Sequence, residues 1–107
     1  MISLTGSQTN WNSYPDDEKK KILQNFGEWV AKLRRNDQFI YGSSLSTNVK
    51  VLTKTGTGIR VDGPFPESKE LLTGFFMIKA ESFEAAMEIA QTNPGLAIGE
   101  VVTLAEV

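Results

Sequence analysis

The spacing of apolar residues predicts two amphipathic helices. Over residues 15–35, apolar side chains recur every three or four positions, which is typical of one buried helix face: Ile22, Phe26, Trp29, Val30 and Leu33. Acidic residues at the start of this segment and basic residues at its end complement the helix dipole. Gly27 inside it predicts close approach to a neighbouring element. A second helix is predicted over residues 83–92, with Ser82 as its N-cap.

Alternating or continuous apolar runs predict the strands. Residues 1–5 and 39–42 are short candidate strands, and a polar loop over residues 6–13 follows the first of them. Residues 48–53 and 57–61 alternate around a glycine-containing link, a pattern that indicates a β-hairpin. Residues 75–78 are continuously apolar and predict a central strand, with a short helical turn over residues 67–72 before it. Residues 99–107 predict a final alternating strand.

The order of these elements predicts an α+β, ferredoxin-like βαββαβ fold with an inserted β-hairpin. In such a fold the two helices cover one face of an antiparallel sheet. A central strand that is apolar on both sides needs a second cover for the open face. We therefore expect a homodimer through the open sheet face, although the chain's own hairpin and loops are an alternative cover.

Composition limits the classes of function. The 107 residues are expected to form one domain, residues 1–107, with a formal charge of -2, which provides no basic surface for nucleic acid. No apolar run is long enough to cross a membrane, and no signal peptide is evident, so a cytoplasmic location is expected. The chain has no cysteine and no histidine. This excludes thiolate chemistry, the usual neutral-pH base and the commonest metal ligands.

The segment Val61-Asp62-Gly63-Pro64-Phe65, with the glycine-aromatic strand that follows it, resembles the DGPF or YCII-related family. The resemblance extends over nearly the whole chain. It implies a ferredoxin-like protomer that assembles into a dimeric α/β barrel, with a cleft near the aspartate. Relatives in the YCII branch pair an aspartate with a histidine, and this chain lacks the histidine. What the resemblance transfers is therefore Asp62 and its turn, Gly63, Pro64 and Phe65.

Asp62 fits three roles: a catalytic acid or base, a ligand-binding carboxylate, or a turn residue that bonds nearby backbone N–H groups. Burial would raise its pKa, whereas pairing with Arg60 or Lys69 would lower it. The sequence leaves these alternatives open.

Other candidate binding residues also have structural interpretations. Trp11 either lines a pocket or folds over the core, and Phe65 is either a pocket wall or a core plug. Tyr41 offers a phenol on a strand, and Lys69 belongs to a charged cluster that an exposed surface explains equally well. No metal-ligand spacing and no phosphate-binding glycine motif occurs, so neither a metal nor a cofactor is expected.

Three functional hypotheses follow. The first is a homodimer that binds an unidentified small molecule in a cleft near Asp62. The second is an acid–base enzyme, such as a lyase, isomerase or dehydrohalogenase-like protein, that uses Asp62. The third is a non-catalytic regulatory or interaction module, for which no pocket is expected.

Overall fold

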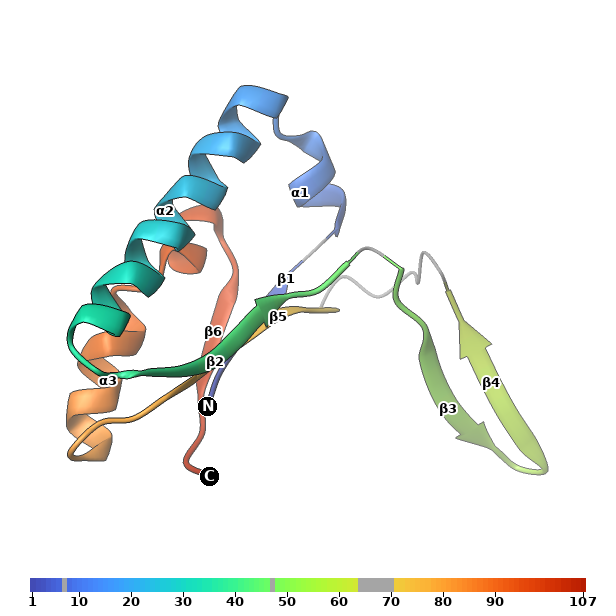
Figure 1. Cartoon of the computed structure of the whole chain (residues 1–107). Helices are drawn as coiled ribbons and strands as arrows, with labels where there is room; N and C mark the ends of the chain where they lie inside the picture. The colour runs from blue at the N-terminus through green and yellow to red at the C-terminus, as the bar shows by residue number, and fades with distance from the viewer. Residues whose placement is uncertain (7, 47, 64–70) are drawn as a thin grey trace.

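The computed structural model describes residues 1–6, 8–46, 48–63 and 71–107, which form an α+β, ferredoxin-like fold (Figure 1). Its main sheet is antiparallel, with strand order β2-β5-β1-β6. These strands are β1 Ile2–Gly6, β2 Phe39–Ser44, β5 Leu71–Ile78 and β6 Val101–Leu104. A separate two-stranded sheet consists of β3 Val51–Thr55 and β4 Gly58–Asp62. The helices are α1 Gln8–Ser13, α2 Asp16–Arg35 and α3 Phe83–Gln91, followed by the 3₁₀ helix η1 Pro94–Ile98.

The hydrophobic core lies between one face of the main sheet and the helices α2 and α3. Its buried members come from four elements: Ile2 and Leu4 of β1, Phe76 of β5, Trp29 and Leu33 of α2, and Ala90 of α3. The Trp29 ring meets Phe76 edge-on, with centroids 5.0 Å apart, and its indole N–H donates to Thr92 Oγ1 at 2.9 Å. The indole therefore joins α2 to both the sheet and the end of α3, which fixes the helix layer on the sheet.

Local sequence explains where the two long helices begin and end. Pro15 precedes α2 as its N-cap. Acidic residues in the first turn and basic residues in the last turn complement the helix dipole. Asp37 follows α2 with a positive φ of 54°, the left-handed conformation that commonly ends helices. At α3, the Ser82 hydroxyl accepts a hydrogen bond from the Ala85 backbone N–H at 3.1 Å. These features confirm the predicted helices to within one residue.

No helix of the described residues covers the opposite face of the main sheet (Figure 1). Strand register assigns Phe75 to this face opposite Ser3 and Ser43, and Met77 opposite Tyr41. The Tyr41 and Phe75 rings lie 5.8 Å apart, and the Tyr41 side chain is 60% exposed. The described part of the chain thus leaves a partly apolar sheet face open, as the sequence predicts for one protomer.

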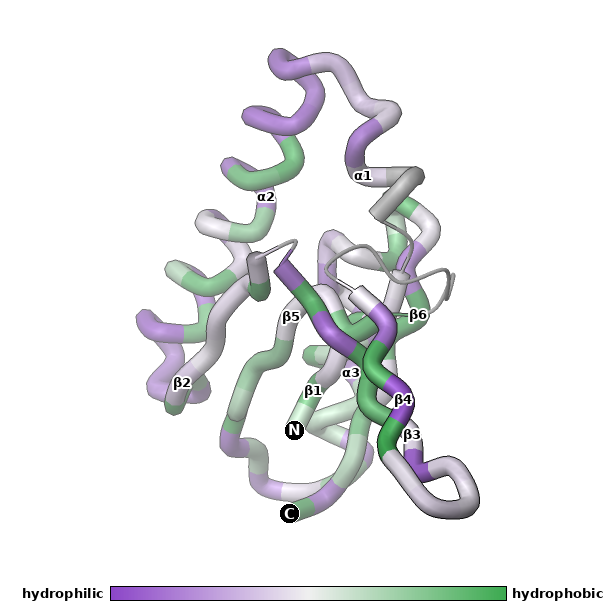
Figure 2. Tube along the Cα trace, turned by 90° about the vertical axis from the view of Figure 1, so that its right-hand side faces the viewer, coloured by the Kyte–Doolittle hydropathy of each residue, from purple (hydrophilic) through white to green (hydrophobic). Residues whose placement is uncertain are grey.

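The hairpin β3–β4 stands apart from the main sheet (Figure 1). Its cross-strand pairs place Leu52, Val61 and Ile59 on one face together with Lys54, and hydropathy alternates along β4 (Figure 2). The three apolar side chains are 56–67% exposed. The hairpin is therefore an amphipathic ribbon whose apolar face the described residues do not cover.

Some sequence expectations differ from the structure. The predicted polar loop over residues 6–13 contains the helix α1, and β5 begins at Leu71, inside the predicted helical turn. A Cβ atom added to Gly27 would meet no heavy atom of the described residues within 4 Å, so this glycine does not serve close packing there. Within the described segments, no helix is long and apolar enough to cross a membrane.

Candidate functional site

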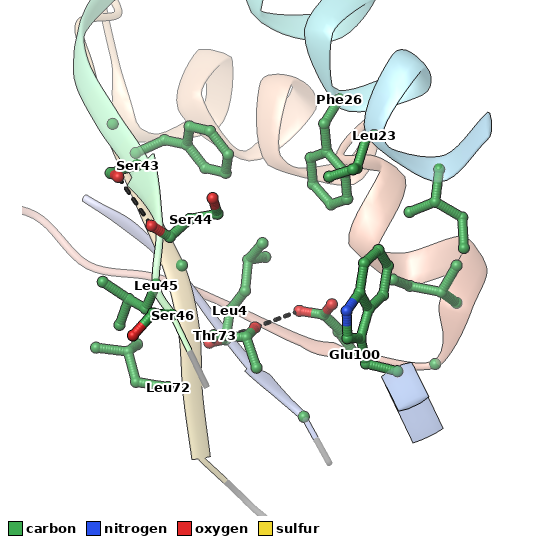
Figure 3. Close-up of a pocket in the computed structure, with 18 of the residues that line it drawn as sticks. Leu4, Leu23, Phe26, Ser43, Ser44, Leu45, Ser46, Leu72, Thr73 and Glu100 are labelled. Carbon is green, nitrogen blue, oxygen red and sulfur yellow. Dashed lines mark hydrogen bonds between the residues drawn. The ribbon is translucent and has the colours of Figure 1, made fainter. Parts of the chain in front are cut away.

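A cavity of about 470 Å³ lies between α1 and α2 on one side and the helix-facing side of the main sheet on the other (Figure 3). Leu23 and Phe26 of α2 face Leu4, Thr73 and Glu100 across it (Figure 3). The remaining described lining residues are mostly apolar or small. They are Gly6, Trp11, Tyr14, Ile22, Gly42, Ser43, Ser44, Leu45, Ser46, Leu72, Gly74, Phe76, Ile98 and Gly99. The cavity is thus an apolar space with few polar groups, the usual character of a small-molecule site.

The loop before β6 positions Glu100 in the cavity wall. Gly99 adopts a positive φ of 80°, a conformation that glycine tolerates without strain, and it ends η1. The next residue, Glu100, donates its backbone N–H to the Gly95 carbonyl at 2.9 Å. The buried Gly95 in turn donates its N–H to Asn93 Oδ1 at 2.7 Å. This chain of contacts holds the backbone of Glu100 against the core.

A β-bulge positions the partner of Glu100. Leu4 pairs with Gly74 but Thr5 pairs with Leu72, so Thr73 is an extra residue on β5. Bulges redirect side chains and are common beside functional sites. Here the Thr73 hydroxyl lies 2.7 Å from Glu100 Oε2 and 3.3 Å from the Leu4 carbonyl oxygen. The bulge therefore brings a hydroxyl donor to the one carboxyl group of the described cavity wall.

Burial raises the pKa of Glu100 above its ordinary value of 4.5, because partial removal from water disfavours the charged form. The hydrogen bond from Thr73 acts in the opposite direction on this pKa and is the smaller effect. A hydroxyl carries a single hydrogen, so Thr73 donates to Glu100 or to Leu4, but not to both at once. When Glu100 is protonated, its own O–H can donate to Thr73 while Thr73 donates to Leu4. Both protonation states of the carboxyl thus have a partner.

Aromatic rings form much of the apolar wall. Phe26 stacks on Phe76 with centroids 6.2 Å apart, and Trp11 lies 6.5 Å from Tyr14. Lys19 Nζ is 5.7 Å from the centroid of the Trp11 ring, within the usual range of a cation–π contact. The wall therefore offers ring faces to a ligand, and the ammonium of Lys19 lies beside one of them.

The structure locates the site residues predicted from sequence in different places. Trp11 lines the cavity, while the exposed side chain of Tyr41 belongs to the open sheet face. Asp62 is the last residue of β4, pairs with Val51 and is not among the described lining residues. Gly63 follows with a φ of 139°, and a Cβ atom there would collide with the Val49 carbonyl. Pro64, Phe65 and Lys69 lie outside the described residues. The functional role predicted for Asp62 remains a prediction.

Sequence reasoning did not single out Glu100 or Thr73. One signal for Glu100 was available, because it is the only charged residue between Glu88 and Glu106, in an otherwise uncharged stretch that contains a proline and two glycines. A lone charge in such a stretch indicates either exposure or a buried polar site. The position of Thr73 depends on the bulge, which the sequence pattern does not reveal.

Metal ligation has no candidate cluster in the part of the chain that the structure describes. No group of three or more His, Cys, Asp or Glu residues is placed there to hold an ion. The polar side-chain groups of the described cavity wall include the carboxyl of Glu100, the indole N–H of Trp11 and the hydroxyls of Ser44 and Thr73. Such groups suit hydrogen bonding and proton transfer.

The fold and the cavity define a class: a small ferredoxin-like α+β domain with a carboxyl-containing pocket between its first helices and its sheet. The model of the YCII-related domain matches residues 2–106. The chain belongs to the YCII-related family, as the Asp-Gly-Pro-Phe stretch predicts. A search of curated proteins finds no match.

Proposed function

We propose that this protein binds a small organic molecule in the cavity around Glu100. The observation that carries the proposal is the enclosure of one carboxyl group, hydrogen-bonded to Thr73, in an otherwise largely apolar cavity of about 470 Å³. Cavities of a few hundred Å³ with few convergent polar groups are typical of ligand sites. The cavity favours this function over an interaction module, for which none is expected.

A second candidate function is acid–base catalysis. A carboxyl group whose pKa is raised by burial is a better proton acceptor near neutral pH than an ordinary one, and such groups concentrate at active sites. Glu100 thus has the property that sequence analysis sought in Asp62. Ligand binding is the function common to both candidates and is tested first.

We propose in addition that the protein acts as a homodimer in the cytoplasm. Two observations support a second copy as partner: the uncovered face of the main sheet and the exposed apolar face of the hairpin. An isolated two-stranded hairpin is marginally stable in water, so its apolar face favours a permanent cover. In a two-fold dimer the same surface of each copy is buried against its partner, so one type of contact covers it in both chains. The absence of cysteine suits a reducing compartment such as the cytoplasm.

The test of binding is a fragment screen by two-dimensional ¹H–¹⁵N NMR on the intact protein. We expect binding fragments to shift the amide signals of Trp11, Phe26, Thr73 and Glu100 together. The variant Ser44→Phe places a ring in the cavity wall and is expected to abolish these shifts. The matched control Gln91→Phe adds the same ring to an exposed site outside the described lining and is expected to preserve them.

Asp62→Asn separates this site from the one predicted at the hairpin. We expect the variant to bind fragments as the wild type does. Loss of binding in Asp62→Asn with retention in Ser44→Phe would contradict the proposal and assign the site to Asp62 instead. The absence of any cavity shift across the fragment library would contradict it as well.

A further inference from the structure

The negative charge of Glu100 has no opposite charge beside it in the described cavity wall. The described lining residues include no lysine and no arginine, and Glu100 is the one carboxylate among them. The hydrogen bond recorded for its side chain comes from Thr73 to Oε2. Within the described residues, Oε1 accepts no hydrogen bond. Among the described residues, the carboxylate therefore has neither an opposite charge nor a second hydrogen-bond donor.

The described residues that line the cavity around Glu100 carry no charge. Gly6 at the end of β1 lies against the Glu100 side chain, because a Cβ atom added to Gly6 would be 3.1 Å from Glu100 Cγ. Strand β5 contributes the hydroxyl of Thr73. The walls from α1, α2 and η1 contribute Trp11, Phe26 and Ile98 among their lining residues. In such surroundings a charge is weakly screened, so a cation that enters gains more than it would in water.

The aromatic wall also favours positive charge. The faces of tryptophan, tyrosine and phenylalanine rings attract ammonium groups. The Trp11 ring already has a cation beside it, since Lys19 Nζ lies 5.7 Å from its centroid. Lys19 is not among the described lining residues, and within the described part of the chain its ammonium forms no ion pair with Glu100.

The described lining combines a carboxylate that has no ion-pair partner there, aromatic walls, and no lysine or arginine. From this combination we infer that the cavity takes an apolar organic amine in its protonated form. The ammonium group donates to Glu100, and the hydrocarbon or aryl part packs against Leu4, Phe26 and Phe76. A neutral alcohol can donate a hydrogen bond to Glu100 Oε1 but does not compensate the negative charge of the carboxylate. A carboxylate or phosphate ligand places a second negative charge beside the first and is rejected. This inference rests on the proposed binding function and specifies its ligand class.

The test compares three ligands of similar shape: 2-phenylethylamine, 2-phenylethanol and phenylacetate. Their dissociation constants for the intact protein are measured at pH 7 by NMR titration. We expect the amine to bind at least tenfold more tightly than the alcohol, and phenylacetate not to bind. Equal or tighter binding of the alcohol or of phenylacetate would overturn the inference while the proposed binding function stands. Cavity shifts from other fragments, but from none of a panel of apolar amines of different sizes, would also overturn it.

Glu100→Gln tests the role of the carboxylate directly. The amide keeps the size of the side chain and removes its charge. The affinity for the amine is therefore expected to fall to that for the alcohol, while the affinity for the alcohol changes little. Glu106→Gln removes the same charge from an exposed position outside the described cavity lining and is expected to leave the tenfold preference intact. An unchanged preference in Glu100→Gln would overturn the inference.

A measurement on the wild type keeps the test independent of the folding of Glu100→Gln. In the wild type, amine binding is expected to weaken as the pH falls through the pKa of Glu100, because the protonated carboxyl no longer offers a charge. An amine affinity that does not change from pH 7 to pH 4, in a protein that remains folded, would overturn the inference.

Discussion

At the scale of single residues, Glu100 is the position where stability and the proposed binding function oppose each other. Its carboxyl is partly removed from water and has one hydroxyl donor, Thr73, which is a costly arrangement for a charged group. A chain under selection for stability alone would place an amide or an apolar side chain there. Ionisable groups whose pKa is shifted by burial are common at functional sites.

This cost predicts a specific pH dependence of stability. Because the pKa of Glu100 is higher in the folded protein than its ordinary value of 4.5, the folded state binds more protons above pH 4.5. The contribution of Glu100 to the free energy of unfolding is therefore fully present below pH 4.5 and is lost as the pH rises through the folded pKa. Glu100→Gln removes this dependence, so its stability relative to wild type is expected to be higher at pH 7 than at pH 4.

Urea denaturation at the two pH values measures this difference. Glu106→Gln, at an exposed position, is the matched control for loss of a negative charge. A difference between Glu100→Gln and wild type that is the same at pH 4 and pH 7 would show that Glu100 does not bind protons more tightly in the folded state.

At the scale of elements, β2 lies close to β5 because Gly42 has no side chain. A Cβ atom at Gly42 would lie 2.6 Å from the Phe76 ring and 2.8 Å from the Phe75 carbonyl oxygen. Both distances are far below van der Waals contact, and one involves backbone. This glycine also lines the cavity, so the close approach of the two strands sets part of the shape of the site.

Gly42→Ala is expected to lower the free energy of unfolding by about 1–3 kcal/mol, the usual cost of overpacking. Gly27→Ala is the matched substitution in α2, where an added Cβ meets none of the described atoms. It is expected to raise the free energy of unfolding by up to about 1 kcal/mol, since alanine favours helix over glycine. Urea denaturation of both variants measures the two changes in the free energy of unfolding. Effects of the same sign would contradict the packing described at β2.

Elements also differ in how far the sequence predicts them. The helices α2 and α3 follow from periodic apolar residues and from the cap at Ser82, which are local signals. The six-residue helix α1 was predicted as a loop, because short helices depend on tertiary contacts more than on propensity. The cavity could not be predicted, since it needs the bulge at Thr73 and the turn at Gly99 that together bring Glu100 to the helix side of the sheet.

At the scale of the whole molecule, the described chain leaves two partly apolar surfaces uncovered: the open sheet face and the hairpin face. The ferredoxin-like order of the strands was predicted from the sequence, and the chain's own helices cover one sheet face as expected. The second copy proposed for the other face is a property of the assembly. Its test is the mass of the protein in solution.

We expect light scattering to give twice the chain mass of 11.8 kDa for the wild type. Tyr41→Lys places a charge on the open sheet face and is expected to shift the protein toward the monomer without unfolding it, because Tyr41 is 60% exposed within one chain. Gln91→Lys introduces the same charge on the exposed end of α3 and is expected to leave the dimer intact. A monomeric wild type, or a dimer that tolerates Tyr41→Lys, would contradict the proposed interface.

The most direct test of the central claim is a crystal structure of the protein soaked with the tightest ligand from the fragment screen. We expect ligand density between Phe26 and Leu4, with a donor atom of the ligand within about 3.2 Å of a Glu100 carboxylate oxygen. Density at Asp62 or on the hairpin, with the space around Glu100 unoccupied by ligand, would contradict it.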